Sequence, residues 1–505
     1  MEDYKVMLSV CRQLFELWNQ IGVRYCHWKS NEHLLDGLVG ETDLDIYVDP
    51  HDKNLCEQLL RDCQYIILTP QKSSRYPQVD EWIGFDQETG KMVHVHLHYR
   101  LITGTKFCKE YTFPLGDLML STRVLNPMYN VYVAAPELEI IILFSRIVLK
   151  APHHHKITSK GYEAEIGYLQ KESDYSKVHE NCLFLLGDKD GAILYSNIVK
   201  ECISEINWTE VFRVVSRWLR DGKTRSSISC WFRTKYYWFR LFYDIILNRW
   251  GATIQNKKVF PTKAISIAFI GQDGSGKSTV TKDIFKWLDW KVSAHIFYLG
   301  TGDGYNSFLK LILKNASKYQ HPKTGNPKNL KKHTTINNNK SKRNLKKRIG
   351  DILTCIYLKK ATSSALNKVR QSHKYINKGG IALYDRYPQS QFPGIYDGPK
   401  IRDMYGDYKG VMARIVSYYA KREEKNIKKI SSFCPNIVFK LRLSPEESIR
   451  RKPFENYELV KRKSEITEAL SFPDSQVILI DASQNYVSEL LTIKKHLWES
   501  FLKIQ

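Results

Sequence analysis

One nine-residue segment carries the residue types and spacing needed to hold phosphate groups. It reads Gly271-Gln-Asp-Gly-Ser-Gly-Lys-Ser-Thr279 and matches the pattern G-x-x-x-x-G-K-[ST] in full. Lys277 would reach the β- and γ-phosphates, and the Ser278 hydroxyl would bind Mg²⁺. We expect the phosphates to be cradled by the loop as a whole, that is by Gly271, Gln272, Asp273, Gly274, Ser275, Gly276, Lys277, Ser278 and Thr279.

The segments on either side of this loop can position it. The apolar run Ala264–Ile270 predicts a strand buried on both faces. The stretch Val280–Trp290 has apolar residues at helical spacing. A strand, a glycine-rich loop and a helix N-terminus in this order aim main-chain N–H groups at an anion.

A second predicted strand ends in a carboxylate, in the segment Ile381-Ala-Leu-Tyr-Asp-Arg-Tyr387. An acid at the carboxyl end of a strand holds Mg²⁺ in phosphate-loop enzymes, which makes Asp385 a candidate metal ligand. Arg386, the next residue, could neutralise an acceptor phosphate with its planar guanidinium group. A structural ion pair at the strand end is the alternative.

Residues 262–485 resemble the thymidylate kinase family. That family has a loop of the type G-x-D-G-x-G-K-S-T and an Asp-Arg pair after its third core strand, as this chain has at 271–279 and 385–386. The later matches are a strand after Pro435, Ser444-Pro-Glu-Glu, the basic Arg450-Arg451-Lys452, and a helix over Glu458–Lys463.

The resemblance implies transfer of the γ-phosphoryl group of ATP to a phosphomonoester, with ATP and Mg²⁺ as cofactors. Asp273 would contact the acceptor's sugar hydroxyl. Arg450 and Arg451 would belong to a lid over the donor phosphates, where positive charge and exclusion of water favour phosphoryl transfer. A solvated helix face is the alternative for these two arginines.

The acceptor stays open, because the chain departs from the family after its second strand. Tyr298-Leu-Gly-Thr-Gly-Asp-Gly304 replaces the family's acceptor loop, and Asp303 is a further acceptor-side candidate. The family's default acceptor is a nucleoside monophosphate such as dTMP. The alternatives are a kinase for a sugar, polyol or glycan end in surface-polysaccharide biosynthesis, and a nucleotide-gated binding module without catalysis.

A second candidate site lies near the N-terminus. Asp43 and Asp45 are two apart on a predicted strand, so both side chains face one way, as a two-metal nucleotidyl transfer requires. Residues 15–105 resemble the nucleotidyltransferase fold and, distantly, the fukutin-like phosphotransferases. The expected third carboxylate has no obvious source, because the next strand carries His94, His96 and His98 on one face. An active transferase, an inactive binding domain and a zinc site all remain open.

The whole chain is predicted to be an α/β multidomain protein. We expect an α+β nucleotidyltransferase-like domain at 1–110, a helical connector at 111–255, and a parallel-sheet P-loop domain at 256–505. Within the last domain, a basic insertion at about 318–347 lacks apolar periodicity and is expected to be mobile. The aromatic, basic helix predicted at 230–249 could lie on a membrane surface or pack between domains.

Charge and composition limit the partners. The 505 residues carry a formal net charge of +24, which favours anionic ligands such as a phosphorylated small molecule or glycan acceptor. We find no nucleic-acid-binding module and no run of 18 apolar residues. Ten scattered cysteines and the absence of a signal-peptide pattern favour a reducing, cytoplasmic location, with peripheral contact at the inner face of a membrane left open.

Overall fold

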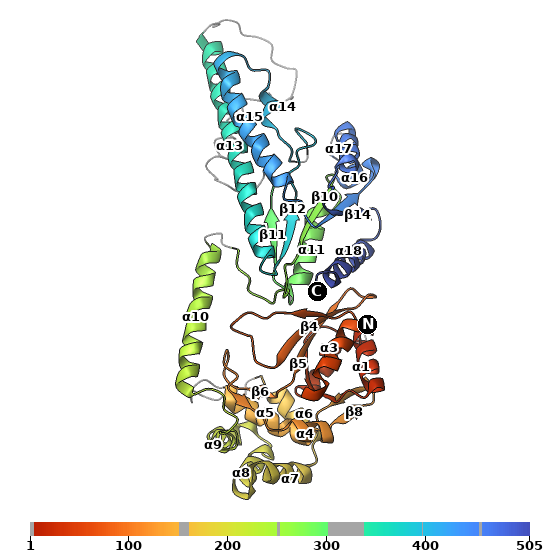
Figure 1. The fold of residues 1–505 in the computed structure, drawn as a ribbon, viewed down its shortest axis with the longest axis vertical. Helices are drawn as coiled ribbons and strands as arrows, with labels where there is room; N and C mark the ends of the chain where they lie inside the picture. The colour runs from red at the N-terminus through yellow and green to blue at the C-terminus, as the bar shows by residue number, and fades with distance from the viewer. Residues whose placement is uncertain (1–4, 151–160, 250–252, 301–337, 396, 454–456) are drawn as a thin grey trace, which may run out of the picture. The chain divides into compact units, whose positions relative to one another are not determined.

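The chain folds into two compact units, shown as a ribbon in the computed structural model of Figure 1. Unit 1 comprises residues 1–261 and 494–505, and unit 2 comprises residues 262–493. The structure describes residues 5–150, 161–249, 253–300, 338–395, 397–453 and 457–505.

Unit 1 is built on a seven-stranded mixed sheet with the strand order β3-β4-β5-β2-β1-β9-β8. Its strands are β1 (Tyr25–His27), β2 (Asp43–Val48), β3 (Ile66–Leu68), β4 (Val79–Phe85), β5 (Met92–His98), β8 (Val124–Asn126) and β9 (Val131–Val133). The two strands β6 (Ile102–Thr103) and β7 (Tyr111–Thr112) form a separate small sheet. Since β8 and β9 complete the large sheet, that sheet crosses residue 110, the expected end of the first domain.

The N-terminal helices pack on this sheet through amphipathic faces. They are α1 (Ser9–Ile21), α2 (Leu34–Leu38) and α3 (Lys53–Asp62), with short 3-10 helices η1 (Asn31–His33) and η2 (Pro50–Asp52). Leu14, Phe15 and Trp18 of α1 are buried in one core with Leu44 and Val95 of the sheet. Their spacing of three and four residues places them on one side of the helix, which therefore covers one face of the central strands.

The remainder of unit 1 is mainly helical, and it lies in the same compact unit as the first sheet. Its elements are α4 (Gly116–Thr122), α5 (Pro136–Lys150), α6 (Glu163–Glu172), α7 (Tyr175–Leu186), α8 (Asp188–Ile198), η3 (Ile203–Glu205), α9 (Trp208–Trp218) and α10 (Ser227–Arg249). Residues 138–149 of α5 are all buried. This helix is apolar around most of its circumference and forms the centre of a second core.

The aromatic helix α10 packs on the rest of unit 1 through one face. Arg233 Nε donates a hydrogen bond to the Phe107 carbonyl (2.7 Å), and the Tyr237 hydroxyl donates to the Lys72 carbonyl (3.0 Å). On the opposite face, Phe232, Phe239 and Phe242 are more than 60% exposed. Within the described residues, no helix has the length and apolar character needed to cross a bilayer.

Unit 2 contains a five-stranded parallel sheet with the order β11-β12-β10-β13-β14. Its strands are β10 (Ser266–Gly271), β11 (Ala294–Tyr298), β12 (Ile381–Asp385), β13 (Ile437–Arg442) and β14 (Gln476–Asp481). The strands predicted at 264–270, before Asp385 and after Pro435 are β10, β12 and β13, and the predicted parallel sheet is confirmed. The strand β10 lies at the centre of the sheet, with β12 and β11 on one side and β13 and β14 on the other. Connections that leave a central strand toward both sides open a crevice at the carboxyl end of that strand.

Helices connect these parallel strands. They are α11 (Lys277–Asp289), α13 (Asn338–Ile376), α14 (Ile401–Tyr405), α15 (Gly410–Ser431), α16 (Pro445–Arg451) and α17 (Tyr457–Ala469). A further helix, α18 (Tyr486–Leu502), follows the last strand, and its residues from Lys494 on belong to unit 1. The long helices α13 and α15 lie side by side and share a small core of Cys355, Leu358, Val416 and Ala420 (Figure 1).

The expected mobile insertion at 318–347 is corrected in its last third. Residues 318–337 lie outside the described residues, whereas residues 338–347 form the first turns of α13. Once the later turns of α13 are anchored in the core, each added residue costs little, and lysine and arginine are good helix formers. Absence of apolar periodicity therefore did not prevent helix formation here.

Candidate functional site

The phosphate-binding loop joins the central strand β10 to helix α11. Gly274 and Gly276 have φ angles of 85° and 83°, in the left-handed region that favours glycine. The side-chain amide of Gln272 donates to the Leu443 carbonyl (2.5 Å), which ties the loop to the end of β13. The predicted strand, loop and helix are thus present in the predicted order.

Lys277, the first residue of α11, curls back over the loop. Its Nζ donates a hydrogen bond to the Gln272 carbonyl (2.6 Å). Burial lowers the pKa of Lys277 to about 8, Asp273 opposes this change, and Arg386 adds to it. A bound polyanion would favour the charged form of this amine.

Ser278 and Asp385 meet at the carboxyl ends of the neighbouring strands β10 and β12. The Ser278 Oγ lies 3.2 Å from Asp385 Oδ2, to which it donates a hydrogen bond. Two adjacent ligands of an octahedral Mg²⁺ ion, each about 2.1 Å from the metal, lie about 3 Å apart. The spacing and the oxygen donors of this pair therefore fit Mg²⁺.

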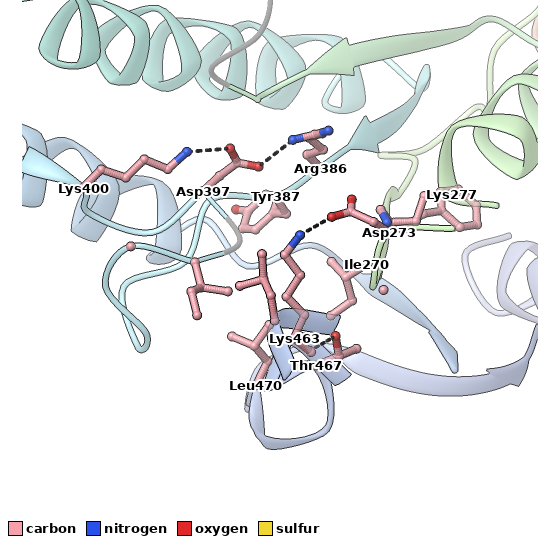
Figure 2. A pocket seen from close by; sticks show the side chains of 15 residues that line it. Ile270, Asp273, Lys277, Arg386, Tyr387, Asp397, Lys400, Lys463, Thr467 and Leu470 are labelled. Atoms are coloured by element: carbon pink, nitrogen blue, oxygen red, sulfur yellow. Dashed lines mark hydrogen bonds and ion pairs between the residues drawn. The ribbon is translucent and has the colours of Figure 1, made fainter. Parts of the chain in front are cut away.

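A pocket of about 300 Å³ opens beside the loop (Figure 2). Its charged lining residues are Asp273, Lys277, Arg386, Asp397, Lys400 and Lys463. Four cations face two carboxylates, so the pocket favours an anionic ligand. Apolar side chains, including Phe269, Ile395 and Leu459, line the rest.

Arg386 enters this pocket from a strained backbone position. Its φ angle is 65°, which is uncommon for a residue with a side chain. Its guanidinium lies 3.8 Å from Asp397, which also lies 3.8 Å from Lys400 (Figure 2). The carboxylate of Asp397 therefore faces the Arg386 guanidinium in the pocket lining.

Asp273, the residue expected to contact the acceptor, is paired with Lys463 of α17 (Figure 2). Burial raises the pKa of Asp273, but the Lys463 ammonium outweighs this effect and leaves that pKa below its usual value. Lys463 was not among the predicted site residues. Its position in the helix that resembles the thymidylate kinase family was the available signal.

The two predicted lid arginines differ in position. Arg451 donates to the Ala482 carbonyl (2.9 Å) and comes within 3.4 Å of the Gly274 carbonyl of the phosphate loop. Arg450 pairs with Glu447 on its own helix, and its side chain is 79% exposed. The structure thus brings Arg451 to the phosphate loop, while Arg450 points to solvent. The acceptor-side candidate Asp303 lies outside the described residues.

A second cluster surrounds Asp43 and Asp45 in unit 1. In the parallel pairing of β2 with β5, Asp43 lies opposite His94 and Asp45 opposite His96. The ring nitrogen Nδ1 of His94 lies 2.7 Å from Asp43 Oδ1, and Nδ1 of His96 lies 3.2 Å from Asp45 Oδ1. Asp45 Oδ1 also contacts Lys29 Nζ (2.9 Å) and His98 Nε2 (3.2 Å).

The third carboxylate of this cluster is Glu81 of β4, which the sequence analysis missed. Glu81 pairs with His96 in the antiparallel register of β4 and β5. The β-branched and aromatic residues of Val79–Phe85 could have indicated a strand, but not its register. Although burial lowers the pKa of His96, the carboxylates of Glu81 and Asp45 raise it to about 9.

Comparison with known proteins gives distant relatives. No protein-family model matches the chain. It is 24% identical over 238 residues to the uncharacterised ATP-binding protein YghR of Escherichia coli K12, covering 45% of this chain and 83% of YghR. It is also 24% identical over 227 residues to the uncharacterised ATP-binding protein YghS of the same strain, covering 43% of this chain and 84% of YghS.

Among solved structures, deoxyadenosine kinase from M. mycoides with bound dATP matches 46% of this chain and 98% of its own. The identity is 16% and the TM-score 0.26. We base no argument on a likeness of this size.

Proposed function

We propose that unit 2 is an ATP-dependent kinase that transfers the γ-phosphoryl group to a phosphomonoester. The observation that carries this proposal is the meeting of Lys277, Ser278 and Asp385 at the carboxyl ends of β10 and β12, next to a cationic pocket. The ATP-binding relatives YghR and YghS support ATP as the donor. The resemblance to thymidylate kinases supports the acceptor class, with dTMP as its default member.

In this proposal, different residues bind the donor, the metal ion and the acceptor. The loop amides and Lys277 hold the donor phosphates, and Ser278 with Asp385 would hold Mg²⁺, which neutralises charge on the phosphates when bound. An oxygen of the acceptor phosphate forms a bond to the γ-phosphorus while the bond to the β-phosphate oxygen breaks, and ADP leaves. Arg386 and Lys463, which line the pocket beside the loop, would bind the acceptor phosphate.

The first test measures ADP release by the full-length protein with dTMP, other nucleoside monophosphates, sugar phosphates and phosphorylated glycans as acceptors. We expect acceptor-dependent ADP release with at least one phosphomonoester, and loss of more than about 100-fold in kcat/KM in Lys277→Ala. Lys282→Ala is the matched control, since Lys282 is exposed on the same helix. It should retain activity within about twofold.

The outcome with each acceptor separates the alternatives. If the protein turns over sugar or glycan phosphates but no nucleoside monophosphate, its acceptor is a sugar or glycan phosphate and not dTMP. ATP binding without turnover on any acceptor would contradict the kinase proposal and favour a nucleotide-gated binding module. Equal activity in the Lys277→Ala and Lys282→Ala variants would show that the activity belongs to another site.

A further inference from the structure

The histidine strand β5 of unit 1 presents a set of imidazoles and carboxylates that the kinase proposal does not use. His94 is fully buried, and Glu81 is 6% exposed. Three adjacent strands, β2, β4 and β5, supply the members of this cluster, so sheet register holds them in place. A site built on paired strands is held more rigidly than one built on loops.

Carboxylates fix the orientation of two of the imidazole rings. Asp43 Oδ1 accepts from Nδ1 of His94, and Asp45 Oδ1 accepts from Nδ1 of His96. In a neutral imidazole with its proton on Nδ1, the lone pair is on Nε2. A carboxylate that orients a histidine in this way is the usual second layer of a metal site.

The two free ring nitrogens converge on one carboxylate oxygen. Nε2 of His94 and Nε2 of His96 each lie 2.9 Å from Glu81 Oε2. Asp43 Oδ2 lies 3.7 Å from the same nitrogen of His96. Ligand atoms that surround one metal ion at 2.0–2.2 Å lie about 3 Å or slightly more from one another, and the two contacts of Glu81 Oε2 are close to this distance.

The close approach of Glu81 Oε2 to His94 Nε2 lies outside hydrogen-bond geometry. Among the described residues, neither His94 Nε2 nor Glu81 Oε2 has a hydrogen-bond partner of acceptable geometry, although both atoms are buried. A buried nitrogen and a buried carboxylate oxygen without such a partner lose the solvation that both had in water. A shared cation would satisfy both atoms at once.

Charge also favours a cation at this position. Asp43, Asp45 and Glu81 contribute three negative charges, while Lys29 pairs with Asp45 and Lys258 lies 3.5 Å from Glu81. With both imidazoles neutral, as metal ligands must be, two ammonium groups against three carboxylates leave one negative charge. Imidazole nitrogen in the donor set selects zinc or another transition metal over magnesium, which prefers an all-oxygen set.

We propose that His94, His96 and Glu81 form a mononuclear site for a divalent transition metal of the zinc class. Asp43 and Asp45 are then positioning residues, because their oxygens orient His94 and His96. Asp45 also contacts Lys29 and His98. This differs from the pair of Mg²⁺ ions that the spacing of Asp43 and Asp45 first predicted. His96 and Asp43 keep 24% and 29% of their side-chain surface exposed, so the metal would remain reachable from solvent.

The test uses the full-length chain, with Zn²⁺ titrated by calorimetry and Co²⁺ followed by its visible absorption. We expect one equivalent of Zn²⁺ per chain, a Co²⁺ spectrum of low coordination number, and no displacement by a large excess of Mg²⁺. His94→Gln and His96→Gln should each weaken Zn²⁺ binding by more than about 100-fold, and Asp45→Asn by about 10- to 100-fold.

His98→Gln and His51→Gln are the matched controls and should bind Zn²⁺ like the natural chain. His98 lies on the same strand face but contacts Asp45 through its Nε2, and His51 is exposed. Lys277→Ala should also bind Zn²⁺ normally, which separates this site from the kinase site. Circular dichroism confirms that each variant is folded.

Three results would overturn the assignment. One is the absence of Zn²⁺ and Co²⁺ binding above the level of the folded His94→Gln/His96→Gln double variant. Another is displacement of Zn²⁺ by Mg²⁺. The third is loss of binding in His98→Gln with retention in His94→Gln, which would move the metal to Asp45, His96 and His98.

Discussion

Single residues decide the chemistry of the pocket beside the phosphate loop. Asp273 and Lys463 are 190 positions apart in the chain, yet they form an ion pair within the pocket lining. A carboxylate next to a cation can select a ligand that carries both a hydroxyl and a phosphate. Under the kinase proposal, this pair belongs to the acceptor side of the site.

Replacement of Lys463 by glutamine is expected to raise the KM for the acceptor by about 10- to 100-fold, because a hydrogen bond to a charged group is lost. The KM for ATP should stay within about twofold, since the loop amides and Lys277 bind the donor. Steady-state kinetics with each substrate varied in turn makes the measurement. Lys461→Gln, an exposed change on the same helix, is the control, and an equal rise in both KM values would contradict the assignment.

The buried carboxylate of Glu139 is expected to make the stability of the protein depend on pH. Its carboxylate is 1% exposed and accepts two hydrogen bonds from Asn31, at 2.9 and 2.6 Å. Burial raises the pKa of Glu139 from 4.5 to about 7, and the bonds from Asn31 only partly oppose this. The folded state therefore binds a proton more tightly than the unfolded chain does.

The sign follows from this difference in proton binding. Below pH 4.5 the Glu139 carboxyl is protonated in both the folded and the unfolded state. Between pH 4.5 and about 7 only the unfolded chain releases this proton. The free energy of unfolding therefore falls by up to roughly 3 kcal/mol as the pH rises through this range. Glu139→Gln should flatten this slope in urea unfolding measured across the range. Glu137→Gln on the same helix is the control, and an unchanged slope in Glu139→Gln would refute the prediction.

At the scale of elements, α10 shows how one helix can serve two environments. Cys230, Arg233 and Tyr237 recur at intervals of three and four residues and form the face that contacts the rest of unit 1. The opposite face carries exposed phenylalanines. Packing against the rest of unit 1 therefore accounts for one face of α10 and leaves the phenylalanines of the other face exposed.

Tyr237→Ala is expected to lower the free energy of unfolding by about 3 kcal/mol, because a buried ring and its hydrogen bond to the Lys72 carbonyl are lost. Phe239→Ala, with a side chain that is 68% exposed, should change it by less than about 0.5 kcal/mol. Urea unfolding followed by circular dichroism compares the two. Equal losses would show that the outward face is also buried in solution, as expected for a helix packed on both sides.

At the scale of the whole molecule, each unit has its own sheet and its own cores, and each carries one of the two candidate sites. The kinase candidate lies at the carboxyl ends of β10 and β12, and the metal candidate lies on β2, β4 and β5. A ligand lowers the rate of local opening where it binds. The two ligands should therefore protect different segments.

Hydrogen exchange of the full chain can detect this separation. A non-hydrolysable ATP analogue with Mg²⁺ is expected to slow amide exchange in residues 271–289, and Zn²⁺ to slow it in residues 79–98. Lys277→Ala should abolish the first effect and leave the second. Protection of residues 79–98 by the nucleotide alone would contradict the assignment of the two ligands to separate units.

The amino-acid sequence alone predicted the features that depend on neighbours along the chain. The strand, loop and helix around Gly271–Thr279 and the strand that ends at Asp385 follow from local periodicity and turn residues. Period-two spacing also placed His94, His96 and His98 on one face of β5. The candidate residues Lys277, Ser278 and Asp385 could be named because each ends or follows a recognisable strand.

Only the tertiary structure decided which strands and helices meet. Glu81 joins the histidines through the register of β4 against β5, and Lys463 reaches Asp273 from a helix late in the chain. The periodicity of one strand defines its two faces but not its partner or their register. Those are set by packing of distant segments, and for this reason the third carboxylate and the acceptor-side lysine came from the fold.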